Sequence, residues 1–129
     1  MTMNCKPIST IDERINDIRM RTAEIVNNDI LPNEGRLWAE RRADESFSDR
    51  TEVLQLRADI KDKVKKAGLW APHLPAEYGG MGLDFLAHAY MNEVLAYAMG
   101  AASLFGVVAP NSGNQSVLVK YGTEEQKRQ

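Results

Sequence analysis

"GLWAPHLPAEYGGMGLDFLAHAYMNEVLA", residues 68–96, joins a segment rich in proline and glycine directly to an apolar helix. The prolines stiffen the entry to this joint, and the glycines after them accept positive φ or a close approach of the backbone. The sequence therefore predicts a rigid connection between two helices, with Tyr78 packed over it as a lid. The residues that make the joint are Pro72, Pro75, Gly79, Gly80 and Gly82.

The helix after the joint is expected to begin at Asp84, an acceptable N-cap, and to run toward Met99. Its apolar side chains cover most of the circumference and leave a narrow polar stripe of His88 and Asn92, which favours a central position. No charged residue occurs between Glu93 and Lys120, although uncharged polar residues interrupt this largely apolar segment. This pattern indicates an interior that is not purely core.

Two amphipathic helices are predicted before the joint. A capping box at Thr10 opens the first, which ends before Pro32, and a capping box at Asp49 opens the second, which ends at Gly68. Each has one apolar face and one polar face that is expected to contact solvent. Both are therefore expected to flank the two helices that come after the joint.

The sequence thus predicts an all-α fold, a packed bundle of about five to six helices in a single domain over residues 1–129. Residues 1–9 are expected to be a flexible tail, and residues 33–48 an irregular connection. A newly capped helix starts at Thr123, with Gln126 at the capping-box position, close to the last residue. Such a turn has little to pack against, so the chain is interpreted as a piece of a longer protein.

Composition excludes several classes of protein. Sixteen basic and eighteen acidic residues give a net charge of −2. The chain therefore lacks the excess of positive charge that is typical of nucleic-acid-binding proteins. Cys5 is the only cysteine, so neither a disulfide framework nor a cysteine-based metal site is expected. The N-terminus lacks signal-peptide features, and the most apolar run, residues 94–109, is short of the roughly 20 residues that span a bilayer. A cytoplasmic protein with no membrane span is expected.

No catalytic or metal-binding set can be assembled from the residues alone. The run "GGMGLD", residues 79–84, has G-x-G spacing, but a phenylalanine occupies the third glycine's place and no strand precedes it. His73 and Glu77 are four apart across prolines that forbid a regular helix, and His88 and Glu93 are five apart, off the helical i+4 spacing. Both histidines are therefore interpreted as ordinary surface or partly buried residues.

Two motifs carry a resemblance to a known family. Residues 68–96 resemble the P-x-E-Y-G-G-x-G segment in the N-terminal helical domain of acyl-CoA dehydrogenases, and "VLVKYGTEEQK", residues 117–127, is similar to the family's G-[ST]-E-E-Q-K stretch. The resemblance implies a flavoenzyme with a helical domain, a β-barrel and a C-terminal four-helix bundle. In the family a carboxylate takes the α proton of an acyl-CoA and FAD N5 accepts the β hydride.

The resemblance also implies what residues 1–129 lack. The barrel and the C-terminal bundle, which hold the catalytic carboxylate and most flavin contacts, lie outside this chain, so it is expected to bind FAD weakly or not at all. The parent enzyme would use acyl-CoA as substrate and electron-transfer flavoprotein as partner, and would form a homo-oligomer. No catalytic or cofactor-binding residue is assigned within the chain.

The part implied for this domain is to wall off the acyl-chain cavity. Counting back from Gly122, the lining helix corresponds to residues 104–113, with Phe105, Ala109 and Gly113 nearest the acyl tail. The two small residues leave volume for long or bulky acyl groups. Packing of the same residues in a pure core remains equally open.

Two further questions stay open at this level. Asn111 and Asn114 either cap the helix of residues 115–120 or bond a polar substituent on the acyl chain. The whole chain is alternatively a self-sufficient helical module that binds a partner helix, or the helical domain of a related acyl-CoA oxidase or nitroalkane oxidase.

Overall fold

The computed structural model describes residues 2–38 and 47–128, and within these ranges it is helical with no strand, which confirms the all-α prediction. Short non-α turns follow the first helix at Val26–Ile30 (π) and Leu31–Asn33 (3₁₀), and another lies in the joint at Ala76–Tyr78 (3₁₀). The α-helices are α1 (Glu13–Ile25), α2 (Glu34–Leu37), α3 (Phe47–Lys66), α4 (Phe85–Leu95), α5 (Ala101–Leu104), α6 (Asn111–Tyr121) and α7 (Glu124–Lys127).

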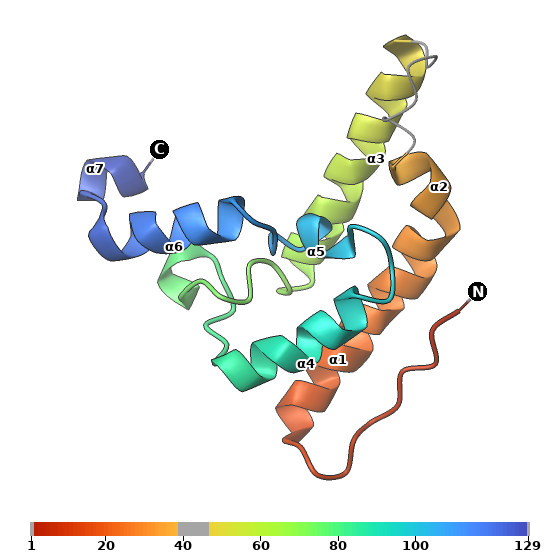
Figure 1. Cartoon of the computed structure of the whole chain (residues 1–129), viewed down its shortest axis with the longest axis horizontal. Coiled ribbons are helices and arrows are strands. Elements are labelled where there is room, and N and C mark those ends of the chain that lie inside the picture. Colours follow the sequence, from red (N-terminus) through yellow and green to blue (C-terminus); the bar gives the residue numbers. More distant parts are fainter. Residues whose placement is uncertain (1, 39–46, 129) are drawn as a thin grey trace.

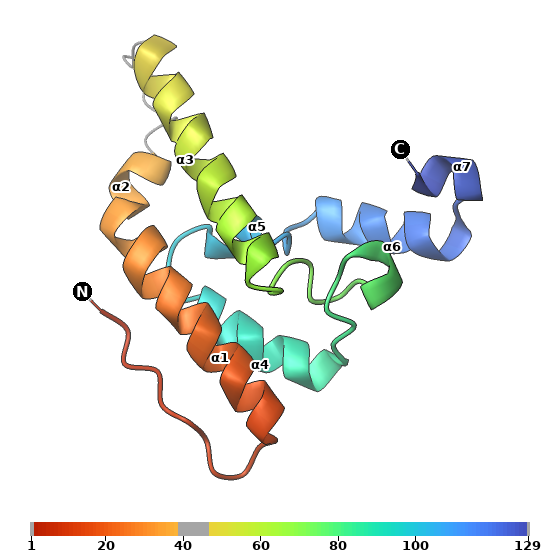
Figure 2. The same ribbon diagram turned by 180° about the vertical axis from the view of Figure 1, so that it is seen from behind.

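The helices divide into a packed group and a projecting pair. α1 and α4 lie side by side, and the end of α3 comes down beside α5 (Figure 1). α6 and α7 reach away from this group, as the view from behind also shows (Figure 2). Within the described residues, no helix combines the length and the apolar character needed to cross a membrane.

The hydrophobic core is shared by the first helices and the chain around α4. The sequence predicts that the two helices after the joint are central and that the first two flank them; α4 does have buried residues, but α6 has none, although the first helices contribute to the core. The prediction for α6 was wrong because an apolar composition does not reveal whether a helix has a partner to pack against. The buried core residues are Ile18, Ile25, Val26, Ile30, Leu37, Ile60, Val64, Leu69, Met91, Leu95, Ala98, Ala101, Leu104 and Phe105.

Helix starts agree with the sequence in two places and differ in two. Asp84 caps α4, and Thr123 forms the predicted capping box of α7. The N-cap of α1 is Asp12 and not Thr10. Helix α3 begins at Phe47, so Asp49 lies inside it and not at the position before its first residue.

Helix ends also differ from the prediction. The first helix was expected to continue to Pro32, but the regular α-helix ends at Ile25 and a π turn and a 3₁₀ turn carry the chain into α2. Helix α4 stops at Leu95, short of Met99. The connection predicted for residues 33–48 therefore includes the single-turn helix α2 and the fully buried Leu37, whereas residues 39–46 lie outside the described ranges.

The N-terminal segment expected as a tail has no helix before α1, but side-chain amides hold its backbone. Asn16 accepts from the Ile8 amide and donates to the Ile8 carbonyl, both at 2.8 Å. Asn27 makes the same pair of bonds with Met3, at 2.8 Å and 2.9 Å. The two asparagines therefore fix the segment along α1 and the π turn that follows it.

Removing one of these amides should loosen the segment. Asn27→Ala is expected to lower the free energy of unfolding by about 1–2 kcal/mol, because two part-buried hydrogen bonds of roughly 1 kcal/mol each are lost. Urea unfolding followed by circular dichroism measures the change. The neighbouring Asn28 is exposed, so Asn28→Ala should stay within about 0.5 kcal/mol of the parent chain. Equal losses in the two variants would contradict this role of Asn27.

Candidate functional site

The joint between α3 and α4 is a closely hydrogen-bonded loop. Its backbone turns through positive φ at Gly79 (+79°) and Gly82 (+60°), as the glycine run predicts. The Gly82 amide donates to the Leu74 carbonyl at 2.8 Å, which closes the loop on itself. The Leu83 amide donates to the Pro72 carbonyl at 3.0 Å, and this bond ties the start of α4 to the entry of the joint.

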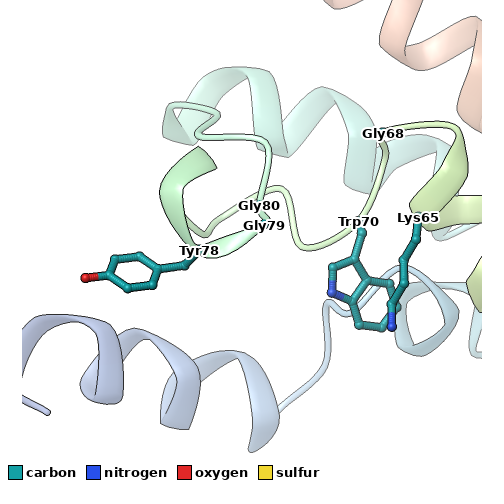
Figure 3. Close-up of a pocket in the computed structure, with 6 residues that line it drawn as sticks. All are labelled: Lys65, Gly68, Trp70, Tyr78, Gly79 and Gly80. Carbon is teal, nitrogen blue, oxygen red and sulfur yellow. The ribbon is translucent and has the colours of Figure 1, made fainter. Parts of the chain in front are cut away.

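Gly80 is required for space and not for its φ. A Cβ added there would lie 2.2 Å from the carbonyl oxygen of Leu74 and 2.5 Å from its Cβ, far inside contact distance. Tyr78 does not form the predicted lid, since its ring points away from the glycines (Figure 3). Its hydroxyl oxygen accepts instead from the Lys127 ammonium at 3.3 Å, which links the joint to α7.

A hollow of about 370 Å³ opens between the end of α3 and the joint (Figure 3). One wall is the ring of Trp70, with the Lys65 ammonium 4.7 Å from the ring centre. On the other side the amides of Gly79 and Gly80 are already bonded to carbonyls within the joint, at 3.0 Å and 3.2 Å. The amides of Gly79 and Gly80 are therefore not free to bind a phosphate, which agrees with the interpretation that residues 79–84 are not a dinucleotide-binding motif.

The predicted acyl-wall residues differ in their burial. Phe105 has no exposed surface and lies in the hydrophobic core, whereas Ala109 and Gly113 are exposed at the start of α6. The lining helix expected over residues 104–113 is not continuous. It breaks because Gly106 has φ +75° between α5 and α6.

Gly106 also explains how this break is fixed. A Cβ there would come within 3.0 Å of the Trp70 ring, so the turn packs directly against the entry of the joint. The Ala71 amide donates to the Phe105 carbonyl at 2.9 Å beside it. The two motifs singled out in the sequence, the joint and the uncharged segment, are thus one connected piece of structure.

The comparison with known families agrees with this arrangement. The family described as acyl-CoA dehydrogenase, N-terminal domain, matches residues 12–129. The chain belongs to the acyl-CoA dehydrogenase family. This acyl-CoA dehydrogenase domain is 39% identical over 88 residues to acyl-CoA dehydrogenase family member 10 of Mus musculus, which covers 64% of the chain and 8% of that protein.

Other relatives cover more of the domain. Human acyl-CoA dehydrogenase family member 11 is 29% identical over 113 residues, which is 88% of this chain and 14% of that protein. Acyl-CoA dehydrogenase FadE12 of Mycobacterium tuberculosis is 30% identical over 91 residues, 70% of this chain and 23% of that protein. The matched region is thus less than a quarter of each of these relatives. No solved structure matches the domain significantly.

Flavin is the cofactor that the acyl-CoA dehydrogenase family implies, and the joint of this domain does not fit it. The bonded amides of Gly79 and Gly80 cannot hold a pyrophosphate, and the side chain that approaches the hollow with a positive charge, Lys65, already lies over Trp70. The described residues also contain no group of three or more histidine, cysteine, aspartate or glutamate side chains that could hold a metal ion. The weak or absent flavin binding expected of this domain stays a prediction.

Helix α6 of the acyl-CoA dehydrogenase domain presents apolar side chains to solvent. Val117, Leu118 and Tyr121 are all exposed. Helix α6 lies in a segment with few charged residues, so these apolar side chains have few charged neighbours along the chain. The predicted cap by Asn111 or Asn114 is wrong, because no side-chain bond caps α6 and its N-cap residue is a proline. Bonding of these amides to a substrate group stays a proposal.

The sequence missed one pair of residues altogether. The rings of His73 and His88 lie with their centroids 6.1 Å apart and their planes at 23°. Burial, and to a smaller extent the neighbouring His73, lowers the pKa of His88 below its usual value of 6.5. Each histidine has a glutamate close to it in the sequence, Glu77 and Glu93, and the spacing to these residues gives no sign of the contact between the two rings across the joint.

Proposed function

We propose that this domain forms part of the acyl-chain pocket of an FAD-dependent acyl-CoA dehydrogenase that introduces the α,β double bond of an acyl-CoA. The observation that carries the proposal is the exposed but uncharged segment from Val108 to Val119 in a chain of this family. A surface that faces water normally carries charged side chains, and an uncharged one that exposes apolar side chains, here Val108, Val117 and Leu118, marks a binding or packing face. An acyl chain requires such an apolar face.

Within this segment the small residues provide the room. Ala109 is exposed, and a Cβ added at Gly113 would meet no atom within 4 Å. Both are proposed to face the acyl tail and to leave a pocket suited to long or bulky groups. Phe105 is proposed as the inner end of the same wall, since its fully buried ring would bound a cavity from within.

Filling this space in the whole enzyme should change its substrate preference. Ala109→Leu is expected to lower kcat/KM for long-chain relative to short-chain acyl-CoAs by about 10-fold or more, because each methylene of a filled pocket is worth roughly 1–3 kcal/mol. Flavin reduction by a series of straight-chain acyl-CoAs gives the ratio. Ala96→Leu, at an exposed position just after α4, should leave the ratio unchanged. An unchanged ratio in Ala109→Leu would contradict the proposed wall.

The activity itself is tested on the whole protein. It should purify with the absorbance of bound flavin and lose that colour when an acyl-CoA is added without oxygen. A colourless product that is indifferent to CoA thioesters would overturn the proposal. Rapid reoxidation of the reduced flavin by oxygen would assign an oxidase instead. Electron-transfer flavoprotein as acceptor, a homo-oligomer and a cytoplasmic location belong to the same proposal.

A further inference from the structure

The two histidines of the chain lie together, although neither belongs to the proposed acyl pocket. His73 lies in the entry of the joint, and His88 lies in the first turn of α4. Their rings are stacked, with centroids 6.1 Å apart and planes at 23°. Two groups that both titrate near neutral pH are therefore adjacent in the fold.

Most of the nitrogens of the two rings are buried and unbonded. Nδ1 and Nε2 of His73 and Nε2 of His88 are out of contact with solvent, and none has a hydrogen-bond partner among the described residues. A neutral imidazole has one N–H donor, whereas a protonated imidazole has two. Because a buried donor without an acceptor is costly, these surroundings favour the neutral form of both rings.

The joint and the start of α4 provide no opposite charge for the pair. Glu77 in the joint is exposed, and the Tyr78 hydroxyl is bonded to the Lys127 ammonium. The Asp84 carboxylate accepts from the Ala87 amide at 2.8 Å and so caps α4. Among the described residues, neither ring takes part in an ion pair.

The helices packed against α4 do not provide an opposite charge either. Arg19 of α1 pairs with Glu93 of α4 at 3.7 Å, and α5 has no ionisable side chain. Asp12 and Arg14, which line a hollow at the start of α4, carry opposite charges. The pKa of His88 is accordingly lowered, by burial first and by the other ring of the pair second.

The backbone holds the two rings in a fixed relation. The Leu83 amide donates to the Pro72 carbonyl at 3.0 Å, which fastens the residue before His73 to the start of α4. The His88 amide donates to the Asp84 carbonyl at 3.0 Å within the first turn of α4. The rings can therefore separate by more than a change of rotamer only if the joint opens.

We propose that His73 and His88 make the joint between α3 and α4 a pH-sensitive connection, closed while both rings are neutral and loosened when they are protonated. Because the pKa of His88 is lowered in the folded chain, the unfolded chain binds the proton more tightly. The contribution of the neutral pair to stability is therefore complete above the ordinary imidazole pKa of 6.5, and it is lost as the pH falls below that value.

Titration of the imidazoles by nuclear magnetic resonance tests this directly, since the two histidines of the 129-residue chain are the pair itself. The pKa of His88 is expected to lie below 6.5 in the parent chain. In His73→Gln, which also assigns the signals, the pKa of His88 should rise, because the neighbouring charge is absent. A parent value at or above 6.5, or no rise in His73→Gln, would overturn the proposal.

Urea unfolding followed by circular dichroism measures the linked loss of stability. From about pH 7.5 to about pH 5.5, the unfolding equilibrium constant of the parent should rise about 3-fold or more beyond that of His88→Gln, the limit for one excluded proton being about 10-fold. Glu77→Gln, an exposed change in the joint, is the matched control and should keep the pH dependence of the parent. Equal pH dependence in the parent and His88→Gln would contradict the pH-sensitive connection. If a histidine variant is unfolded, the pKa of His88 in the parent chain decides.

Discussion

Gly80→Ala is expected to remove about 3 kcal/mol or more of the free energy of unfolding, at the upper end of the cost of overpacking. The added methyl would sit 2.2 Å from the carbonyl oxygen of Leu74, and a backbone atom cannot move aside as the end of a flexible side chain can. The same carbonyl accepts the Gly82 amide at 2.8 Å. Relief of the clash therefore opens the joint that positions α4.

Gly79→Ala is the matched control for this change. Gly79 has φ +79°, but a Cβ there would meet no atom within 4 Å. Its cost should be the left-handed penalty alone, about 1–2 kcal/mol. Urea unfolding followed by circular dichroism compares the two variants. If Gly79→Ala is as destabilising as Gly80→Ala, backbone conformation and not space governs the joint.

Local signals in the sequence explain the parts of the fold that could be predicted. Asp84 and Thr123 cap helices because each side chain needs only the backbone two or three residues ahead. The same logic gave a wrong start for α1, since Asp12 competes with Thr10 and takes the cap. Where two acceptable caps stand close together, packing decides between them, and one sequence does not show packing.

Contacts between distant residues could not be predicted in the same way. Asn27 holds the backbone of Met3 across 24 positions, and nothing near either residue indicates this bond. The pair formed by His73 and His88 depends on how the joint folds back, which spacing along the chain does not encode. An exposed α6 is likewise a property of what surrounds the helix and not of its composition.

The candidate site was likewise predictable in its residues but not in their arrangement. The sequence shows which residues are small and apolar, but the prediction assumed one continuous helix through Phe105, Ala109 and Gly113. Gly106 interrupts that helix with a positive φ, and the Trp70 ring lies where a Cβ at this position would be. A glycine within an apolar run is tolerated in a helix at modest cost, so the sequence alone favoured continuity.

Phe105→Ala should be among the most destabilising single changes in the chain, with an expected loss of about 3–5 kcal/mol of the free energy of unfolding. The ring has no exposed surface and lies in the core cluster with Leu104. Its removal leaves a cavity that the surrounding helices cannot fill. The Phe105 carbonyl also accepts the Ala71 amide at 2.9 Å, so a shift of the backbone here disturbs the joint as well.

Phe85→Ala provides the comparison, because the same residue type at the start of α4 is 90% exposed where Phe105 is 0% exposed. Its removal should change the free energy of unfolding by less than about 0.5 kcal/mol in this chain. Urea unfolding of both variants under the same conditions measures the difference. A small effect of Phe105→Ala would mean that the ring does not belong to the packed core, and would favour a role at the surface of the acyl pocket. A large effect would show that the inner end of the proposed wall is first a structural anchor, which holds the segment of Ala109 and Gly113 in place.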